Sequence, residues 1–185
     1  DGDPTDVVFR SVNGTTGETI WHYQPDLDPI VRRVFYQAAS RGVTVGHGKV
    51  YLGGGFASTS FFAFDAYSGE MDWAIRAPDG GPTAAIIKDR WVIFNTESCT
   101  LFVADAETGD LRWSRWLGDP LMSQPAAAGE LVFSAYPAGE TYKFGAFRLE
   151  DGTWSQPRNL GGRINTEACE MYASVSPDGC YLFYH

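Results

Sequence analysis

The stretch "DAETGDLRW" (residues 105–113) decides the fold, because the chain contains it three times in related form. Residues 65–73 read "DAYSGEMDW" and residues 13–21 read "NGTTGETIW". All three copies place a Ser or Thr before a glycine, an acidic residue after it, and a tryptophan four positions beyond the glycine. A turn and a tryptophan that recur together predict a repeated structural unit.

A second recurrent element lies upstream of three tryptophans, and it consists of a polar turn followed by an apolar strand. The separation between this turn and the tryptophan is 25 residues from Gly48 to Trp73, 24 from Asp89 to Trp113 and 25 from Gly129 to Trp154. Each unit thus contains four short antiparallel strands in about 40 residues, which is typical of a β-propeller blade. A β-sandwich also has regularly spaced strands, but it gives no reason for the same turn and tryptophan in every unit.

We therefore predict an all-β fold, a single β-propeller domain over residues 1–185 with four-stranded antiparallel blades. The expected units are a half-blade at 5–25, an insertion at 26–40, blades at about 40–76, 82–116 and 122–157, and a half-blade at 167–185. The insertion contains "DPIVRRVFYQAAS", whose N-cap aspartate, following proline and apolar periodicity predict a short helix. The two half-blades sum to one blade. Either the chain ends pair and close a ring of about four blades, or the chain is a fragment of a larger propeller.

The glycines and tryptophans of the repeat have structural roles in this fold. We expect Gly69 and Gly109 to supply a positive φ in the hairpin before the last strand of a blade. The tryptophan of that strand should lie flat between adjacent blades and bury roughly 150–250 Å². This inter-blade role is predicted for the four tryptophans of the units, Trp21, Trp73, Trp113 and Trp154.

Composition excludes several classes of function. The 185 residues carry a net charge of −9, which argues against binding to nucleic acid or to anionic membrane surfaces. No apolar run approaches the roughly 20 residues that a membrane-spanning helix needs. The three cysteines show no spacing typical of a metal site, and they are Cys99, Cys169 and Cys180.

The repeat resembles the tryptophan-docking repeat of quinoprotein propellers over about residues 5–135. That family includes dehydrogenases that depend on pyrroloquinoline quinone (PQQ) and the propeller subunit of the outer-membrane β-barrel assembly machinery. Residues 145–185 instead resemble TolB-like, WD-type propeller repeats, with their "NLG", "INT" and "SPDG" landmarks. Both resemblances imply a propeller, and fold alone does not fix activity.

The resemblance to the alcohol dehydrogenases of this family implies where a cofactor would bind. In those enzymes two adjacent cysteines face the quinone, shortly before an Arg-Gly that also contacts it. Here the Arg-Gly is present as Arg41-Gly42, whereas Phe35 and Tyr36 stand at the cysteine positions. A Ca²⁺ ligand from the next blade corresponds to the region of "FNTESC", which offers Asn95 and Glu97.

Two functions remain open from the sequence. The first, which we favour, is a non-catalytic propeller that binds a protein or glycan surface ligand in the periplasm or on the cell surface, without a cofactor. The alternative is a PQQ-dependent, Ca²⁺-containing quinoprotein oxidoreductase, or a fragment of one. The absent cysteine pair favours the first.

Overall fold

The computed structural model describes residues 9–23, 42–53, 59–117, 124–138, 141–150, 153–154, 158–168, 170, 174–176 and 178–184. All regular elements among these residues are β-strands, and every strand pair is antiparallel. The predicted all-β propeller architecture is therefore confirmed. The helix expected within residues 26–40 lies outside the described residues.

Two central sheets have four strands each, in sequential order. The first contains β3 (Val43–Gly46), β4 (Lys49–Gly53), β5 (Ser60–Asp65) and β6 (Met71–Arg76). The second contains β7 (Ile86–Lys88), β8 (Trp91–Asn95), β9 (Thr100–Asp105) and β10 (Leu111–Trp116). In both sheets the second and third strands are mostly buried, whereas the outer strand alternates between exposed and half-buried residues. This pattern follows from the sequence, because "WVIFN" and "LFVAD" are apolar on both faces.

The third complete sheet is less regular at its outer edge. Its strands are β11 (Ala126–Ala128), β12 (Leu131–Ala138), β13 (Thr141–Glu150), β14 (Thr153–Trp154) and β15 (Arg158–Asn159). The short strands β14 and β15 both pair with β13, at different places along it. Two short strands thus share the position that β6 or β10 fills alone, and the last pairing of this sheet reaches Asn159.

A two-stranded sheet lies at each end of the chain. One contains β1 (Phe9–Val12) and β2 (Thr19–Tyr23), and the other contains β16 (Ser174–Val175) and β17 (Leu182–Phe183). Among the described strands, β1 pairs only with β2 and β17 only with β16.

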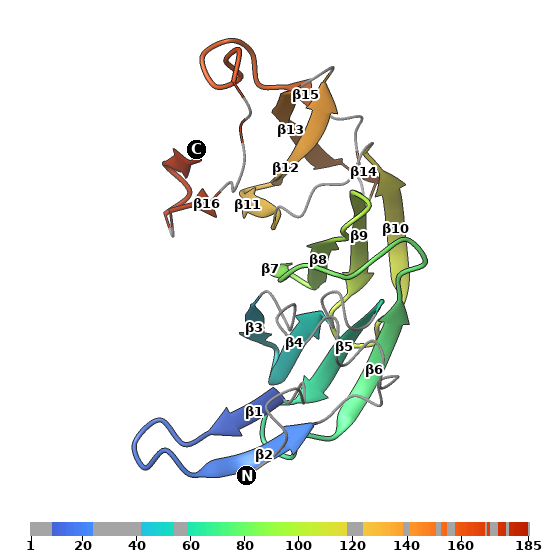
Figure 1. Ribbon diagram of the computed structural model, residues 1–185, viewed down its shortest axis with the longest axis vertical. Coiled ribbons are helices and arrows are strands. Elements are labelled where there is room, and N and C mark those ends of the chain that lie inside the picture. Colours follow the sequence, from blue (N-terminus) through green and yellow to red (C-terminus); the bar gives the residue numbers. More distant parts are fainter. Residues whose placement is uncertain are drawn as a thin grey trace.

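The five sheets follow one another along an arc, with β3, β7, β11 and β16 on its concave side (Figure 1). The two terminal hairpins lie at opposite ends of this arc. A four-bladed ring closed by pairing of the chain ends, one of the two arrangements expected from the sequence, is thus not the arrangement observed. The described residues contain no helix long and apolar enough to cross a membrane.

Candidate functional site

In three of the sheets, the hairpin turn before the outer strand is organised by one side chain. Asp65 Oδ1 accepts hydrogen bonds from the backbone N–H groups of Tyr67 (3.0 Å) and Ser68 (2.7 Å), and the Ser68 hydroxyl accepts one from Glu70 N–H (3.2 Å). The same set recurs with the oxygens of Asn13 and Asp105 as acceptors. These bonds satisfy donors that the tight turn would otherwise leave unpaired.

The glycine of this turn has positive φ at all three places, +75° at Gly17, +75° at Gly69 and +76° at Gly109. This region is readily accessible to glycine and costly for other residues. Sequence reasoning thus identified the glycine and its conformation. It did not assign the Asx residue four positions earlier, although "D-A-x-[S/T]-G" displayed it in two of the repeats.

The tryptophan of one blade docks on the turn glycine of the next blade. A Cβ at Gly69 would lie 2.5 Å from Trp21 Cγ, and one at Gly109 would lie 2.7 Å from Trp73 Cδ2. Each indole N–H donates to a carbonyl of the same turn, Trp21 to Ala66 (3.1 Å) and Trp73 to Glu107 (3.1 Å). The glycine is therefore required twice, for its φ and for the space above it.

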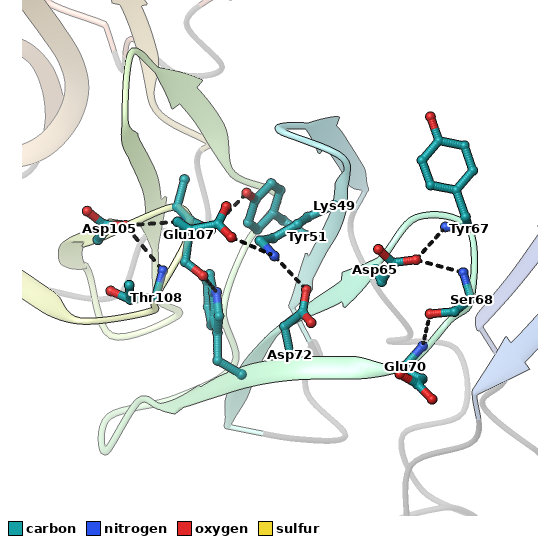
Figure 2. A network of polar contacts seen from close by, with 12 residues as sticks. Lys49, Tyr51, Asp65, Tyr67, Ser68, Glu70, Asp72, Asp105, Glu107 and Thr108 are labelled. Carbon is teal, nitrogen blue, oxygen red and sulfur yellow. Dashed lines mark hydrogen bonds and ion pairs between the residues drawn. The ribbon is translucent and has the colours of Figure 1, made fainter.

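Aromatic and charged groups surround these docking sites. Trp73 contacts Tyr51 and Phe61, with ring centroids 5.8 and 6.2 Å away. The Tyr51 hydroxyl donates to the carbonyl of Ala106 (3.0 Å), and burial raises the pKa of Tyr51 to about 12. Figure 2 shows the adjoining charged group, Lys49, whose ammonium lies 2.7 Å from the Asp72 carboxylate and 3.5 Å from that of Glu107.

The Lys49 ion pairs connect two blades. Asp72 belongs to the same sheet as Lys49, whereas Glu107 lies in the turn of the following sheet. The hydrogen bond to Asp72 is the main cause that raises the pKa of Lys49. In the next sheet the turn carboxylate Asp105 also pairs with Arg90, and this bond holds the pKa of Asp105 below its usual value.

The other two predicted inter-blade tryptophans lie in the second and third complete sheets. Trp113 is in β10 opposite Val103, and it packs against a buried cluster that contains Ile93, Leu101, Val103 and Val132. Trp154 is in β14, opposite Leu149.

A cavity of about 580 Å³ lies along the inner strands, where the channel of a propeller runs. Its lining comes from all four inner strands and the residues before β11: Val43, Thr44, Val45, Ala85, Ile86, Ile87, Gln124, Pro125, Ala126, Ala127, Ser174 and Val175. All of these side chains are neutral. The Ala85 carbonyl joins three blades here, because it accepts hydrogen bonds from the Thr44 hydroxyl (2.6 Å) and the Gln124 amide (2.9 Å).

The candidate cofactor ligands are not gathered at this cavity in the part of the chain that is described. Asn95 is fully buried at the end of β8, where its Oδ1 accepts from Thr96 N–H (3.1 Å) and its backbone bonds Thr83. Glu97 follows in a half-buried turn, with its N–H bonded to the Gly81 carbonyl (3.0 Å). Neither lines the cavity. Arg41, Phe35 and Tyr36 lie outside the described residues.

No group of three or more His, Cys, Asp or Glu side chains within the described ranges is arranged to hold a metal ion. The buried polar residues that sequence reasoning missed here are Thr83 and Thr96. The Thr83 hydroxyl accepts from Asn95 N–H and connects the loop before β7 to the end of β8, whereas the Thr96 hydroxyl accepts from Thr100 N–H at the start of β9. Their signal in the sequence was weak, because a lone threonine beside an apolar strand is common.

Comparisons with known proteins agree with this architecture. A structure of BamB from Moraxella catarrhalis superposes with a TM-score of 0.62 at 20% identity, over 91% of this chain and 50% of that one. A europium-containing methanol dehydrogenase matches with a TM-score of 0.51 at 15% identity, over 65% of this chain and 25% of that one. At these identities the two structures show the fold alone.

A sequence relative has higher identity over a shorter region. A Paracoccus denitrificans protein named as the dehydrogenase XoxF is 32% identical over 93 residues, which cover 46% of this chain and 15% of that protein. This chain thus spans half or less of the length of each of these three proteins.

The profile of one protein family matches residues 57–163, and its description is outer membrane protein assembly factor BamB. These residues include the second and third complete sheets and the strands β5 and β6 of the first, with the docking site of Trp73 on Gly109. The match extends over more than half of the chain, and the protein accordingly belongs to the family of the outer membrane protein assembly factor BamB.

Proposed function

We propose that this chain is a non-catalytic β-propeller module that binds another protein in the bacterial cell envelope, in the periplasm or at the cell surface. The observation that carries the proposal is the family match, because that family is described by an assembly role rather than by a reaction. The blades supply rigid sheets joined by docked tryptophans, and such a frame suits the presentation of loops to a partner.

The chemistry of the channel cavity supports the same proposal. PQQ is planar and multiply anionic, so its binding away from water needs cationic groups or a metal ion to offset its charge. The described lining is neutral, and the Asn95 amide oxygen is already bonded to a backbone N–H. This neutral lining supports a propeller without a bound quinone, and we derive no reaction step through PQQ.

The alternative is a quinoprotein dehydrogenase or part of one. The 32% identity to the protein named as XoxF over 93 residues is the observation that favours it. That match covers 15% of the relative, so most of the relative lies outside the aligned region.

One experiment separates the two. The chain is titrated with PQQ in the presence of Ca²⁺ by calorimetry, and oxidation of methanol is followed with an artificial dye acceptor. We expect no binding below millimolar concentration and no turnover above background. Sub-micromolar binding together with turnover would overturn the proposal in favour of the dehydrogenase.

A second measurement tests binding directly. The outer-membrane β-barrel assembly machinery, purified without its own propeller subunit, is immobilised, and the chain is passed over it in surface plasmon resonance. We expect saturable binding, which a heat-unfolded sample of the chain does not reproduce. Absence of saturable binding would count against this partner and against the assembly role.

A further inference from the structure

The outer strands β2, β6 and β10 each contain a β-bulge directly after their hairpin turn. At each bulge, two residues of the outer strand stand opposite one residue of the neighbouring strand: 19–20 opposite Val12, 71–72 opposite Phe64, and 111–112 opposite Ala104. A bulge bends its strand and changes the direction of the side chains that follow. In all three strands both bulged residues are exposed, and the tryptophan comes directly after them.

Each of these bulges exposes a large apolar side chain. Ile20 is 57% exposed, Met71 52% and Leu111 51%. A side chain that is needed for packing within the chain would be buried, so packing does not explain an apolar residue at the bulge of three blades. Apolar side chains that gather on an exposed surface mark interaction sites, whereas single scattered ones are normal.

The docked tryptophans hold the three turns next to one another. Trp21 docks on Gly69 in the second turn, and Trp73 docks on Gly109 in the third. The outer strands thus follow one another along the convex side of the arc (Figure 1). The exposed apolar residues beside these turns form what we call the bulge ridge: Val12, Ile20, Tyr67, Met71 and Leu111.

The turns beside the bulge ridge are acidic. Together the three turns, residues 13–18, 65–70 and 105–110, contain six carboxylates and no Lys, Arg or His. The last residue of each turn is an exposed carboxylate directly before the bulge, and these residues are Glu18, Glu70 and Asp110. The apolar side chains of the ridge are therefore bordered by negative charge in every blade.

The opposite end of the first two complete sheets does not share this charge. Among the residues described there, Arg76 and Arg115 near the ends of β6 and β10 balance Asp79 and Glu97 of the loops. Trp116, which is 66% exposed, is the last residue of β10 at that end. The combination of repeated apolar residues with excess negative charge thus belongs to the bulge ridge.

We propose that the bulge ridge is the docking surface for a segment of a partner protein that carries both apolar and basic side chains. The apolar side chains pack on the ridge, and Lys or Arg side chains pair with the carboxylates of the turns. Charge complementarity determines this occupant, because the turn carboxylates attract a basic segment and repel an acidic one or an anionic lipid surface. The inference rests on the proposed function, since it specifies where that partner binds and by which chemistry.

A cavity beside the third turn offers a place for one long side chain of the segment. Its volume is about 320 Å³, and its lining is formed by His47, Arg90, Asp105, Ala106 and Glu107. Arg90 is paired with the nearly buried Asp105, whereas the side chain of Glu107 is 72% exposed. Glu107 is therefore the carboxylate that a Lys or Arg entering this cavity would meet.

The first test uses a fluorescent synthetic peptide of leucine and lysine as the probe. Its binding to the chain is followed by fluorescence anisotropy, with a peptide of leucine and glutamate for comparison. We expect saturable binding of the lysine peptide alone, and this binding should weaken as salt is added, because salt screens exposed charges. Absence of binding, or equal binding of both peptides, would overturn the proposal.

The second test removes the apolar side chains of the bulges. A chain with Ile20→Ser, Met71→Ser and Leu111→Ser should bind the lysine peptide about tenfold more weakly, as expected when central apolar contacts are truncated. The matched control is Trp116→Ser, which changes an exposed apolar residue at the other end of β10 and should leave the dissociation constant unchanged. A triple variant that binds like the parent chain, or a control that loses as much affinity, would rule out the ridge.

A separate variant removes charge and keeps the turns. Glu18→Gln, Glu70→Gln and Asp110→Asn retain a side-chain oxygen as acceptor, including those that accept from Thr16 and Thr108. This chain should bind the lysine peptide more weakly at low salt and show a smaller salt dependence. An unchanged salt dependence would overturn the pairing with the turn carboxylates.

The immobilised assembly machinery distinguishes this inference from the proposed function. Saturable binding of the parent chain that the triple serine variant weakens about tenfold would support both. Saturable binding that this variant retains would overturn the ridge and leave the proposed function standing. Analytical ultracentrifugation of the parent chain should show a monomer, and a dimer that the triple variant dissociates would overturn the proposal in favour of a second copy.

Discussion

The junctions at Trp73 and Trp21 use the same docking contact on a turn glycine, but they differ in the side chains that pack over the tryptophan. Trp73 docks on Gly109 beneath Tyr51, Phe61 and a continuous buried cluster that spans both sheets. Trp21 docks on Gly69 with the same hydrogen bond and a similar contact, yet among the described residues its cluster contains only three buried side chains, those of Leu52, Phe62 and Phe64. Among the described strands, the outer-strand contact at Trp21 therefore stands without inner strands, whereas at Trp73 the inner strands supply the rest of the core.

Removal of each tryptophan gives the largest difference between the junctions. Trp73→Ala should cost about 3–5 kcal/mol of unfolding free energy, as expected for a packed tryptophan, against a total of ~5–15 kcal/mol for a domain. Trp21→Ala should cost less, because one side of the indole faces a cavity of about 200 Å³. Urea unfolding with tryptophan-independent far-UV detection measures both. Equal costs for the two variants would mean that the inner strands add nothing to a docked tryptophan.

Substitutions at the turn glycines separate two energetic costs: that of positive φ in a residue other than glycine, and that of a clash with the docked tryptophan. Gly109→Ala should destabilise by about 2–5 kcal/mol, because positive φ costs an L-residue ~1–2 kcal/mol and overpacking adds ~1–3 kcal/mol. Gly17 is the matched control: it has φ +75° in the same turn, and an added Cβ meets no atom within 4 Å. Gly17→Ala should therefore cost only about 1–2 kcal/mol.

Thermal melts of the two variants measure the difference. If Gly17→Ala destabilised the fold as much as Gly109→Ala, the positive φ of the turn alone would account for the requirement for glycine. The close contact between Gly109 and Trp73 would then add nothing to the free energy of unfolding. At the third turn glycine, Gly69, an added Cβ would lie 2.5 Å from Trp21 Cγ, so Gly69→Ala should follow Gly109→Ala rather than Gly17→Ala.

Much of the fold could be predicted from the sequence because three of its units contain the same turn and tryptophan at the same spacing. The "[S/T]-G-[D/E]-x-x-W" unit predicted the blades, and "WVIFN" predicted a strand covered on both faces. The partner of each tryptophan could not be predicted in this way. Its glycine lies in the following blade, about 40 residues onward, and only the curvature of the arc brings the two together.

The candidate cofactor site shows a second limit. Asn95 and Glu97 were chosen because they match a region of a family, and a match in sequence does not say which way a side chain faces. The end of β8 turns Asn95 into the interior, where it is bonded to backbone groups. Position along a chain and position around a channel are related only through the strand register, which short motifs do not specify.

The smallest predicted effect concerns the Asx residue of the turn. Hydrogen bonds from the backbone N–H groups of Ser68 and Tyr67 hold the pKa of Asp65 below its usual value. A lowered pKa in the folded state means that the carboxylate stabilises the fold above the unfolded pKa of about 3.9, and that this contribution is lost as the pH falls through the folded pKa.

Asn13 accepts the same two bonds through a group that does not titrate in this range, so Asp65→Asn should keep the turn. We expect almost no change in unfolding free energy near pH 7 and a shallower loss of stability between about pH 4 and pH 2. Asp105→Asn is the contrasting variant, because it also removes the ion pair with Arg90 and should already weaken the fold at pH 7. Urea titrations at pH 7 and at low pH measure the free energy of unfolding of both variants. If Asp65→Asn lowered it as much at pH 7 as Asp105→Asn does, the turn would need the negative charge itself rather than the hydrogen-bond acceptor.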